Sequence, residues 1–343
     1  MENYVNFALE KTVELLAIDS PTGYTAAADE YVSKEFAALG YEVTRPVKGG
    51  VVVDLGGTDV NDGVLLQAHA DTIGGMVAEV KANGRLRIIN IGGTNANNVE
   101  SENCRVVTKF NGTYEGTLQI VNASLHVSSN YSDTKRAFPV MEVVLDEKVS
   151  SAEDVKALGI RPGDFVCFDP RTKITKSGFI KSRYLDDKLC VGILLAFAKY
   201  LKDNNITPSR RVYVHSTVYE EVGHGGAASV PAGVTEVISV DMGCVGEGVQ
   251  CTEHMVSICA KDTGGPYSYE LIKKLLLAAE KEGADYALDV YPSYGSDVEA
   301  TISAGYDVRH GVIGPGVYAS HGYERSHKEG VLNTLKLIKG FLL

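Results

Sequence analysis

The sequence predicts an α/β protein in which helices flank a central mixed β-sheet and a small β-barrel domain is inserted into the chain. Strand-like and helix-like segments alternate along most of the 343 residues, which is typical of a sheet covered by helices. Residues 74–169 depart from this alternation, because they consist mainly of short β-rich segments separated by Gly, Asn and Ser turns. Such spacing is typical of a small barrel.

The first part of the chain is expected to form a helix and two strands. Apolar residues recur at helical spacing over residues 5–16, and the Ser-Pro-Thr-Gly turn at 20–23 ends that helix. Strands are predicted at residues 50–55 and 63–68, and the second is a continuous apolar run of the kind found inside a sheet. His69 therefore stands at the end of a buried strand.

The inserted region is predicted to be a domain of its own. Its β-rich segments are at residues 86–89, 118–121 and 141–145, and one helix-like segment lies at 151–158. We therefore expect the main domain to consist of residues 1–73 and 170–343, and the inserted β-barrel to consist of residues 74–169.

The second part of the main domain continues the alternation of strands and helices. After Asp186 the pattern becomes helical, with one apolar face formed by Leu189, Ile193, Ala196, Phe197, Tyr200 and Leu201. The later elements are expected to be strands at 211–218, 237–240, 288–291 and 308–313, a helix at 269–280, and a last helix with an apolar stripe over 331–342.

Composition excludes several classes of partner. The formal charge is −11 and no long basic run is present, which argues against nucleic acid and anionic membrane surfaces. No segment is apolar enough to span a bilayer. The six cysteines form no Cys-x-x-Cys pair and lie in apolar stretches, and the first 18 residues lack the pattern of a signal peptide. These features predict a cytoplasmic protein.

Acidic and imidazole side chains gather where predicted strands end or a helix begins. They are His69, Asp71, Asp186, Asp187, Glu220, Glu221, Asp241 and His321. Several have an ordinary explanation when taken singly, since Asp at a helix start caps free N–H groups and Asp after a strand favours a turn. The Glu220-Glu221 pair is harder to explain in this way, because two carboxylates after an apolar strand are costly to bury without a compensating metal or proton.

Taken together, these residues predict a site with two metal ions. Strand ends in an α/β protein converge on one edge of the sheet, so that the side chains meet there. Imidazole and carboxylate ligands without thiolate favour zinc, with cobalt or manganese as alternatives, and two neighbouring ions need a carboxylate that bridges them. We therefore expect a two-metal hydrolase.

The motifs carry a family resemblance over nearly the whole chain. His69-x-Asp71, Asp186-Asp187-Lys188, Glu220-Glu221-Val222-Gly223, Asp241, Gly295-Ser296-Asp297 and His321-Gly322-Tyr323-Glu324 resemble, in order, the signature of the TET and glutamyl aminopeptidases, which are dinuclear zinc exopeptidases. The resemblance implies an α/β catalytic domain of the zinc-exopeptidase type, interrupted by a PDZ-like dimerisation barrel.

The resemblance also implies a role for each site residue. It assigns His69, Asp186 and Asp241 to one metal ion, and Asp186, Glu221 and His321 to the other, with Asp186 bridging.

By the same resemblance, Glu220 is the general base and Asp71 supports the metal-bound imidazole. If the Glu220-Glu221 segment is extended, its successive side chains point in opposite directions. On that expectation, only Glu221 contacts metal.

The activity implied is removal of N-terminal residues from short peptides. Closely related alternatives are a metal-dependent carboxypeptidase or deacylase. Paired carboxylates could also cleave glycosides, although the chain has no Trp to stack against sugars. A non-catalytic metal-binding scaffold is a further alternative. The resemblance finally implies a homo-oligomer, in which dimers assemble into a dodecamer.

Overall fold

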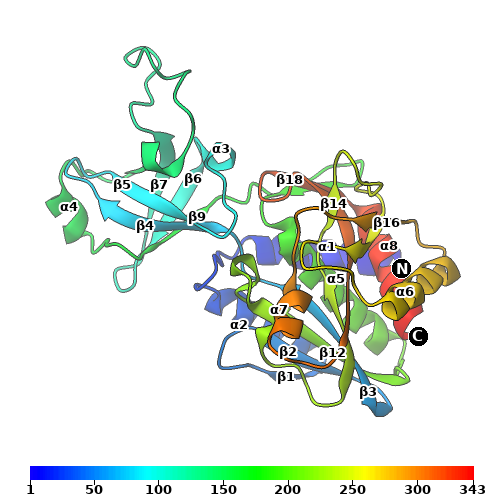
Figure 1. Ribbon diagram of the computed structural model, residues 1–343. Helices are drawn as coiled ribbons and strands as arrows, with labels where there is room; N and C mark the ends of the chain where they lie inside the picture. The colour runs from blue at the N-terminus through cyan, green and yellow to red at the C-terminus, as the bar shows by residue number, and fades with distance from the viewer. The chain divides into compact units, whose positions relative to one another are not determined.

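The chain folds into two units. The computed structural model describes residues 1–343. The larger unit consists of Met1–Asp71 and Arg171–Leu343, and the smaller unit consists of Thr72–Pro170 (Figure 1). The predicted fold class, a mixed α/β sheet with an inserted β-barrel, is confirmed.

The larger unit is built on a twelve-stranded mixed sheet. Its strands are β1 (Glu42–Thr44), β2 (Val51–Gly56), β3 (Asp59–His69), β10 (Lys173–Ile174), β11 (Phe179–Ser182), β12 (Arg210–Thr217), β13 (Val234–Val240), β14 (Gly243–Val245), β15 (Val256–Lys261), β16 (Tyr286–Val290), β17 (Arg309–Tyr318) and β18 (Glu324–His327). The main strand order is β1-β2-β12-β3-β13-β17-β18-β11-β10. The four neighbours β12, β3, β13 and β17 are parallel, so their carboxyl ends share one edge.

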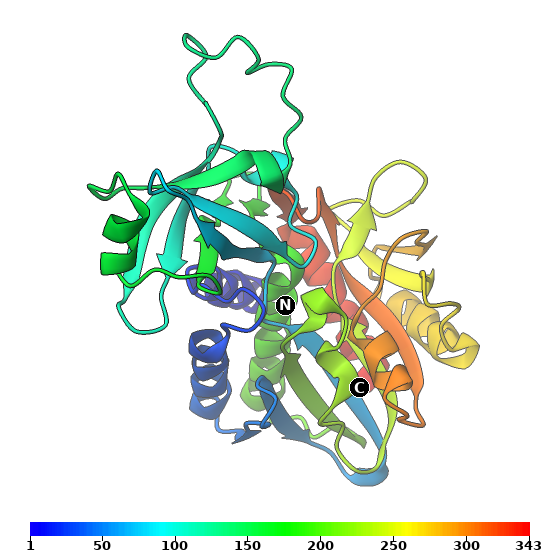
Figure 2. The same cartoon turned by 60° about the vertical axis from the view of Figure 1, so that its left-hand side comes forward.

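Helices cover both faces of this sheet. They are α1 (Glu2–Leu16), α2 (Ala26–Ala38), α5 (Leu185–Asp203), α6 (Tyr269–Glu282), α7 (Asp297–Ser303) and α8 (Lys328–Leu342), with single 3₁₀ turns η2 (Glu220–Val222) and η3 (Gly225–Ala227). Helix α5 packs against α1 and α8, and α8 packs against α6 (Figures 1 and 2). Helix α7 packs on β3, β13 and β17, where Thr301 hydrogen bonds to Gln67. None of the helices is long and apolar enough to cross a membrane.

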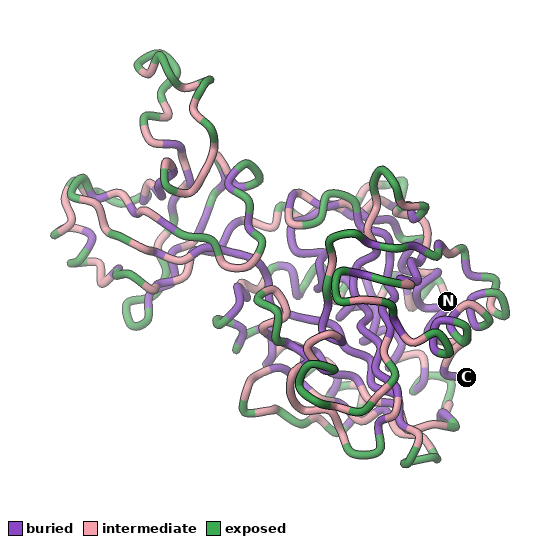
Figure 3. Tube along the Cα trace, in the orientation of Figure 1, coloured by how far each residue is buried: buried purple, intermediate pink, exposed green.

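Helix α5 differs from the amphipathic helix that the sequence predicts. Its residues from Leu185 to Ala198 are all buried, because the sheet and the helices α1, α2 and α8 surround it (Figure 3). A helix that is apolar on most sides is expected in such a position. Gly192 permits the close approach of α1, since a Cβ atom there would lie 2.2 Å from Thr12 Oγ1 and 2.7 Å from the carbonyl oxygen of Ala8.

The smaller unit is a closed barrel with its own core. The strand order is β4-β5-β8-β7-β6-β9. Its elements are β4 (Gly74–Val80), β5 (Leu86–Ile91), α3 (Ala96–Val99), β6 (Asn103–Val107), β7 (Thr113–Ile120), η1 (Phe138–Val140), β8 (Met141–Leu145), α4 (Ala152–Ala157) and β9 (Phe165–Phe168). Side chains from all six strands fill the interior, among them Leu86, Val106, Leu118, Val143 and Val166. The predicted helix at 151–158 is confirmed as α4, and Ser151 and Asp154 form its capping box.

A buried carboxylate ties together three elements at the amino end of β13. Glu236 is 0% exposed and accepts hydrogen bonds from Arg210 Nη1 (2.6 Å), Lys274 Nζ (2.6 Å) and Arg309 Nε (3.0 Å). Burial alone would raise the pKa of Glu236, but these cations outweigh burial and lower the pKa below its ordinary value. The ion cluster therefore stabilises the folded state only while Glu236 is ionised.

Replacing Glu236 with Gln is expected to destabilise the larger unit by about 2 kcal/mol at pH 7, because charge-assisted hydrogen bonds are lost. A carboxylate whose pKa is lower in the folded state adds stability above its unfolded pKa, and this stability is lost as the pH falls through the folded pKa. The difference between wild type and Glu236→Gln should thus shrink below about pH 4. Urea unfolding at several pH values measures this, with exposed Glu247→Gln as the control. Equal stability at pH 7 would contradict the prediction.

Candidate metal centre

Four adjacent parallel strands deliver the predicted site residues to one edge of the sheet. Strand β3 ends at His69, β13 ends one residue before Asp241, and β17 ends three residues before His321. Strand β12 pairs with β3 through Thr217 and His69, and the turn η2 with its two glutamates follows it. Side chains separated by many residues in sequence therefore meet at the carboxyl ends of the strands.

Asp186 and Asp187 lie at the start of helix α5, whereas the other site residues follow the ends of strands. Both have non-helical backbone angles, so the regular helix begins after them. The peptide bond between them is cis. Both side chains are buried. The expectation that Asp186 opens a helix is thus right in position, although neither aspartate is a regular first-turn residue.

Asp186 lies between the two predicted imidazole ligands. Its Oδ1 is 3.0 Å from His69 Nε2, and its Oδ2 is 3.6 Å from His321 Nε2. Glu221 Oε2 is 3.5 Å from the same His321 nitrogen. Ligand atoms around a tetrahedral zinc ion are about 3.4 Å apart for bonds of about 2.1 Å. One carboxylate oxygen of Asp186 thus faces each imidazole, so that Asp186 would be able to hold cations on both sides.

Two groups of ligand atoms have the spacing of a metal site. One consists of His69, Asp186 and Glu221, and the other of His69, Asp187 and Asp241; within each group all atoms lie within 4.8 Å of one another. Asp187 was not among the ligands predicted from the sequence. Its position next to Asp186 was the feature of the sequence that could have indicated it. Its Oδ2 accepts a hydrogen bond from the His69 amide, and its buried Oδ1 has no partner.

The expectation of an extended Glu220-Glu221 segment was wrong. The two residues lie in a 3₁₀ turn after Tyr219, which has a left-handed backbone. Their carboxylates nevertheless separate, since successive residues of a 3₁₀ helix are about 120° apart. Glu220 Oε2 is 3.5 Å from His69 Nε2, whereas Glu221 lies against His321.

Asp71 supports the site in a different way from the one expected. Its main-chain carbonyl, 2.8 Å from His69 Nδ1, accepts the imidazole hydrogen bond, and its carboxylate is 3.7 Å away. The carboxylate instead accepts hydrogen bonds from the Glu220 amide (3.2 Å) and the Thr22 hydroxyl (2.6 Å). Asp71 therefore fixes the position of both His69 and Glu220.

Two further residues position the cluster, and their roles were missed from the sequence although both belong to the quoted motifs. Ser296 donates its hydroxyl to Asp241 Oδ2 at 2.6 Å. The buried carboxylate of Glu324 accepts hydrogen bonds from the Asp186 amide (3.2 Å) and the His321 amide (3.1 Å). Glu324 thus connects the two segments that carry these ligands.

The electrostatics of the cluster favour bound cations. Burial raises the pKa of Asp187 and Glu221 well above the ordinary range, and neighbouring Asp241 and Asp186 add to this. Burial and Asp186 raise the pKa of Asp241 to about 7. Divalent cations would relieve this repulsion between buried carboxylates. The donor set of imidazoles and carboxylates, together with the unpartnered Asp187 oxygen, fits two zinc-class ions.

The cluster opens into a cavity of about 540 Å³. Five carboxylates line it, those of Asp186, Glu220, Glu221, Asp241 and Glu299, together with His321 and a neutral wall that includes Met242, Cys244, Tyr294 and Ser296. A bound molecule in this cavity would therefore contact the metal ligands directly.

The model of the M42 glutamyl aminopeptidase family matches residues 49–337. The chain belongs to this family. The resemblance inferred from the motifs is thereby confirmed, and the enzyme is a metallo-aminopeptidase of the M42 family.

One curated relative agrees with this assignment, and two solved structures agree with the fold. The M42 chain is 43% identical over 334 residues to a Bacillus subtilis protein named "Putative aminopeptidase YhfE", covering 97% of this chain and 96% of that one. Its fold resembles an aminopeptidase from Desulfurococcus kamchatkensis, with a TM-score of 0.88, 23% identity and coverage of 99% and 95%. It also resembles the TET1 peptidase of Pyrococcus horikoshii, with a TM-score of 0.84, 23% identity and coverage of 98% and 99%.

Substituting Glu324 in this M42 enzyme is expected to weaken metal binding. In Glu324→Gln an NH₂ group replaces one of the two carboxylate oxygens that accept from the backbone N–H groups of Asp186 and His321. One of these two N–H groups therefore loses its hydrogen-bond acceptor, and the segment that carries it is held less firmly. Loss of such outer hydrogen bonds typically lowers metal affinity about 10–100-fold. Competition with a chelator measures the zinc affinity, with Glu247→Gln as the control. Unchanged affinity would show that Glu324 does not position the ligands.

Proposed function

We propose that this M42 enzyme removes N-terminal residues from short peptides by hydrolysis at two divalent metal ions, zinc in the first place and cobalt or manganese as alternatives. In this proposal His69, Asp186 and Asp241 hold one ion, and Asp186, Glu221 and His321 hold the other. The main support for this proposal is the position of Asp186, whose two carboxylate oxygens face the imidazoles of His69 and His321 respectively.

Bound at these positions, the ions would polarise the scissile carbonyl and lower the pKa of the attacking water. Glu220 accepts the proton of that water and returns it to the leaving amine. Burial raises the pKa of Glu220 above its ordinary value, which favours uptake of the proton by this carboxylate. The hydrogen bond from the Glu220 amide to Asp71 holds the base in place during both transfers.

Removal of N-terminal residues is supported by the charge of the cavity. A free peptide N-terminus is a cation, and the five lining carboxylates provide partners for it. A carboxypeptidase would need a cationic group for the C-terminal carboxylate, and neither Lys nor Arg lines the cavity. The charge of the cavity thus favours the aminopeptidase over this alternative.

We further propose that the enzyme acts as a homo-oligomer in the cytoplasm. The Pyrococcus horikoshii relative is described as assembling into a tetrahedron or a large octahedral shell, which supports assembly of dimers into a dodecamer here. All six cysteines are free, five of them buried, which agrees with a reducing compartment. The partners in this proposal are short peptides and further copies of the chain, not nucleic acid or membrane.

The variant Glu220→Gln is expected to retain two metal ions per chain and to lose about 10²–10⁴-fold in kcat, because it cannot accept the proton. Asp186→Asn should retain fewer ions, since the bridging carboxylate is lost. Elemental analysis and hydrolysis of aminoacyl anilides measure both effects, with Glu247→Gln as the control. Full activity in Glu220→Gln would remove this residue from its proposed role.

Among N-terminal residues, Asp and Glu are expected to be cleaved with the lowest kcat/KM. Two bound ions would offset four of the five negative charges of the lining carboxylates, and no Lys or Arg is present to pair with an acidic substrate side chain. An aminoacyl-anilide panel at constant ionic strength tests this, and acetylated peptides serve as the blocked control. A preference for N-terminal Glu over Gln would contradict the expectation.

A further inference from the structure

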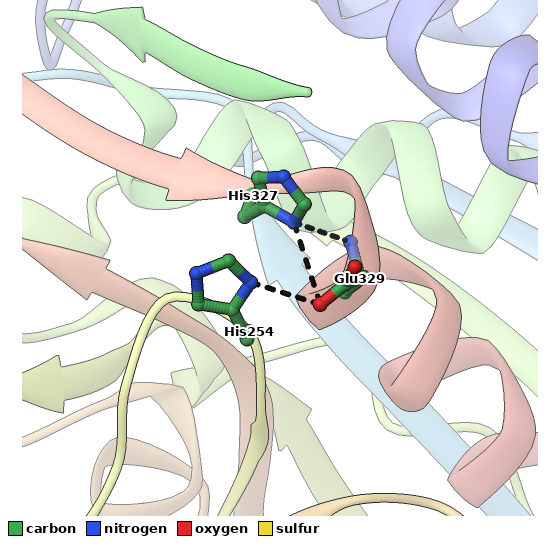
Figure 4. Close-up of side chains that lie close together, drawn as sticks. All are labelled: His254, His327 and Glu329. Carbon is green, nitrogen blue, oxygen red and sulfur yellow. Dashed lines mark hydrogen bonds and ion pairs between the residues drawn. The ribbon is translucent and has the colours of Figure 1, made fainter. Parts of the chain in front are cut away.

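A second group of metal-binding side chains lies at the junction of β18 and α8. It consists of His254, His327 and Glu329, and its ligand atoms lie within 4.8 Å of one another (Figure 4). Glu329 Oε2 is 2.9 Å from His254 Nδ1 and 3.9 Å from His327 Nδ1. None of the three residues lines the cavity of the catalytic centre or belongs to its ligand groups.

The His327 ring is held in one orientation and one tautomer. Its Nε2 lies 2.8 Å from the carbonyl oxygen of Ser177 and donates a proton to it, so Nδ1 carries the lone pair that faces Glu329. The ring is buried, and a Cβ atom at Gly178 would lie 2.7 Å from Nε2, so glycine is required for this close fit. A main-chain carbonyl on the other nitrogen is the usual arrangement for a metal-bound histidine.

The surroundings also suit a cation. The centroids of the His254 and His327 rings are 4.3 Å apart, so both imidazoles lie close enough to share one ion. Phe179 packs edge-on against both rings and limits their movement. The neighbouring Arg325 is paired with Glu253, so its charge is already compensated.

We propose that His254, His327 and Glu329 form a third divalent-cation site of the zinc class, separate from the catalytic centre. Ligands of a tetrahedral zinc ion lie about 3.4 Å apart, and the observed 2.9 and 3.9 Å bracket this value. At present His327 Nδ1 accepts a 3.2 Å hydrogen bond from the Glu329 amide. A bound ion would take the place of this amide at Nδ1, and the amide would then donate to water. His254 and Glu329 are 40% and 56% exposed, which leaves a coordination position for water.

The site has a structural consequence. His254 precedes β15, whereas His327 and Glu329 lie at the start of α8, so one ion would connect segments far apart in the sequence. A ligand that binds only the folded state raises its stability. Zinc at this site would therefore hold the start of α8 against the segment before β15.

Zinc stoichiometry tests the proposal in the full-length enzyme. Dialysis against buffered free Zn²⁺ followed by elemental analysis should find one Zn²⁺ more per chain in wild type than in His254→Gln or Glu329→Gln. Both substitutions fall on partly exposed side chains, and His126→Gln provides an exposed histidine control that should bind as wild type does. Peptidase activity of the variants should stay unchanged, because they leave the catalytic residues intact.

Two results would overturn the proposal. One is an equal zinc count in wild type and in both variants. The other concerns crystals of wild type that contain the additional zinc ion. If the anomalous signal of that ion lies away from these three side chains, the proposal is wrong. A signal between them, together with a zinc-induced rise in melting temperature that is smaller in His254→Gln than in His126→Gln, would establish the site independently of the proposed peptidase mechanism.

Discussion

The crowding of buried carboxylates at one edge of the sheet is the constraint on which the rest of the structure depends. Asp186, Asp187 and Asp241 are buried, and the side chain of Glu221 beside them is only 3% exposed. Their mutual repulsion is unfavourable unless cations or protons compensate it. The surrounding chain contributes donors that hold the carboxylates in place, including the His69 amide at Asp187 and the Ser296 hydroxyl at Asp241.

The sheet topology explains how such a cluster is assembled. Parallel order of β12, β3, β13 and β17 places four chain segments at one edge, each just after an apolar strand whose burial fixes its position. The fifth segment, with Asp186, enters at the start of the buried helix α5, and Glu324 connects it to the segment that carries His321. The rigid parts of the fold thus determine where the reactive groups lie.

The two histidine clusters share one principle of construction. A main-chain carbonyl accepts the proton of one ring nitrogen in both His69 and His327, through Asp71 and Ser177 respectively. The other ring nitrogen of each histidine faces carboxylate oxygen atoms. The clusters differ in surroundings, because the first is buried among several acids whereas the second has a single glutamate and partial access to solvent.

The sequence by itself determined the α/β class, the inserted barrel and the family, and it predicted which imidazole and carboxylate side chains gather at the sheet edge, because apolar periodicity and motif order are local properties of the chain. It did not determine the 3₁₀ turn at Glu220-Glu221 or the use of the Asp71 carbonyl, since backbone angles there depend on packing around the site. Only the tertiary structure revealed Asp187, Ser296 and Glu324 as partners of the ligands. It also brought His254 to His327 and Glu329, because a contact across more than seventy residues arises from strand pairing and helix packing.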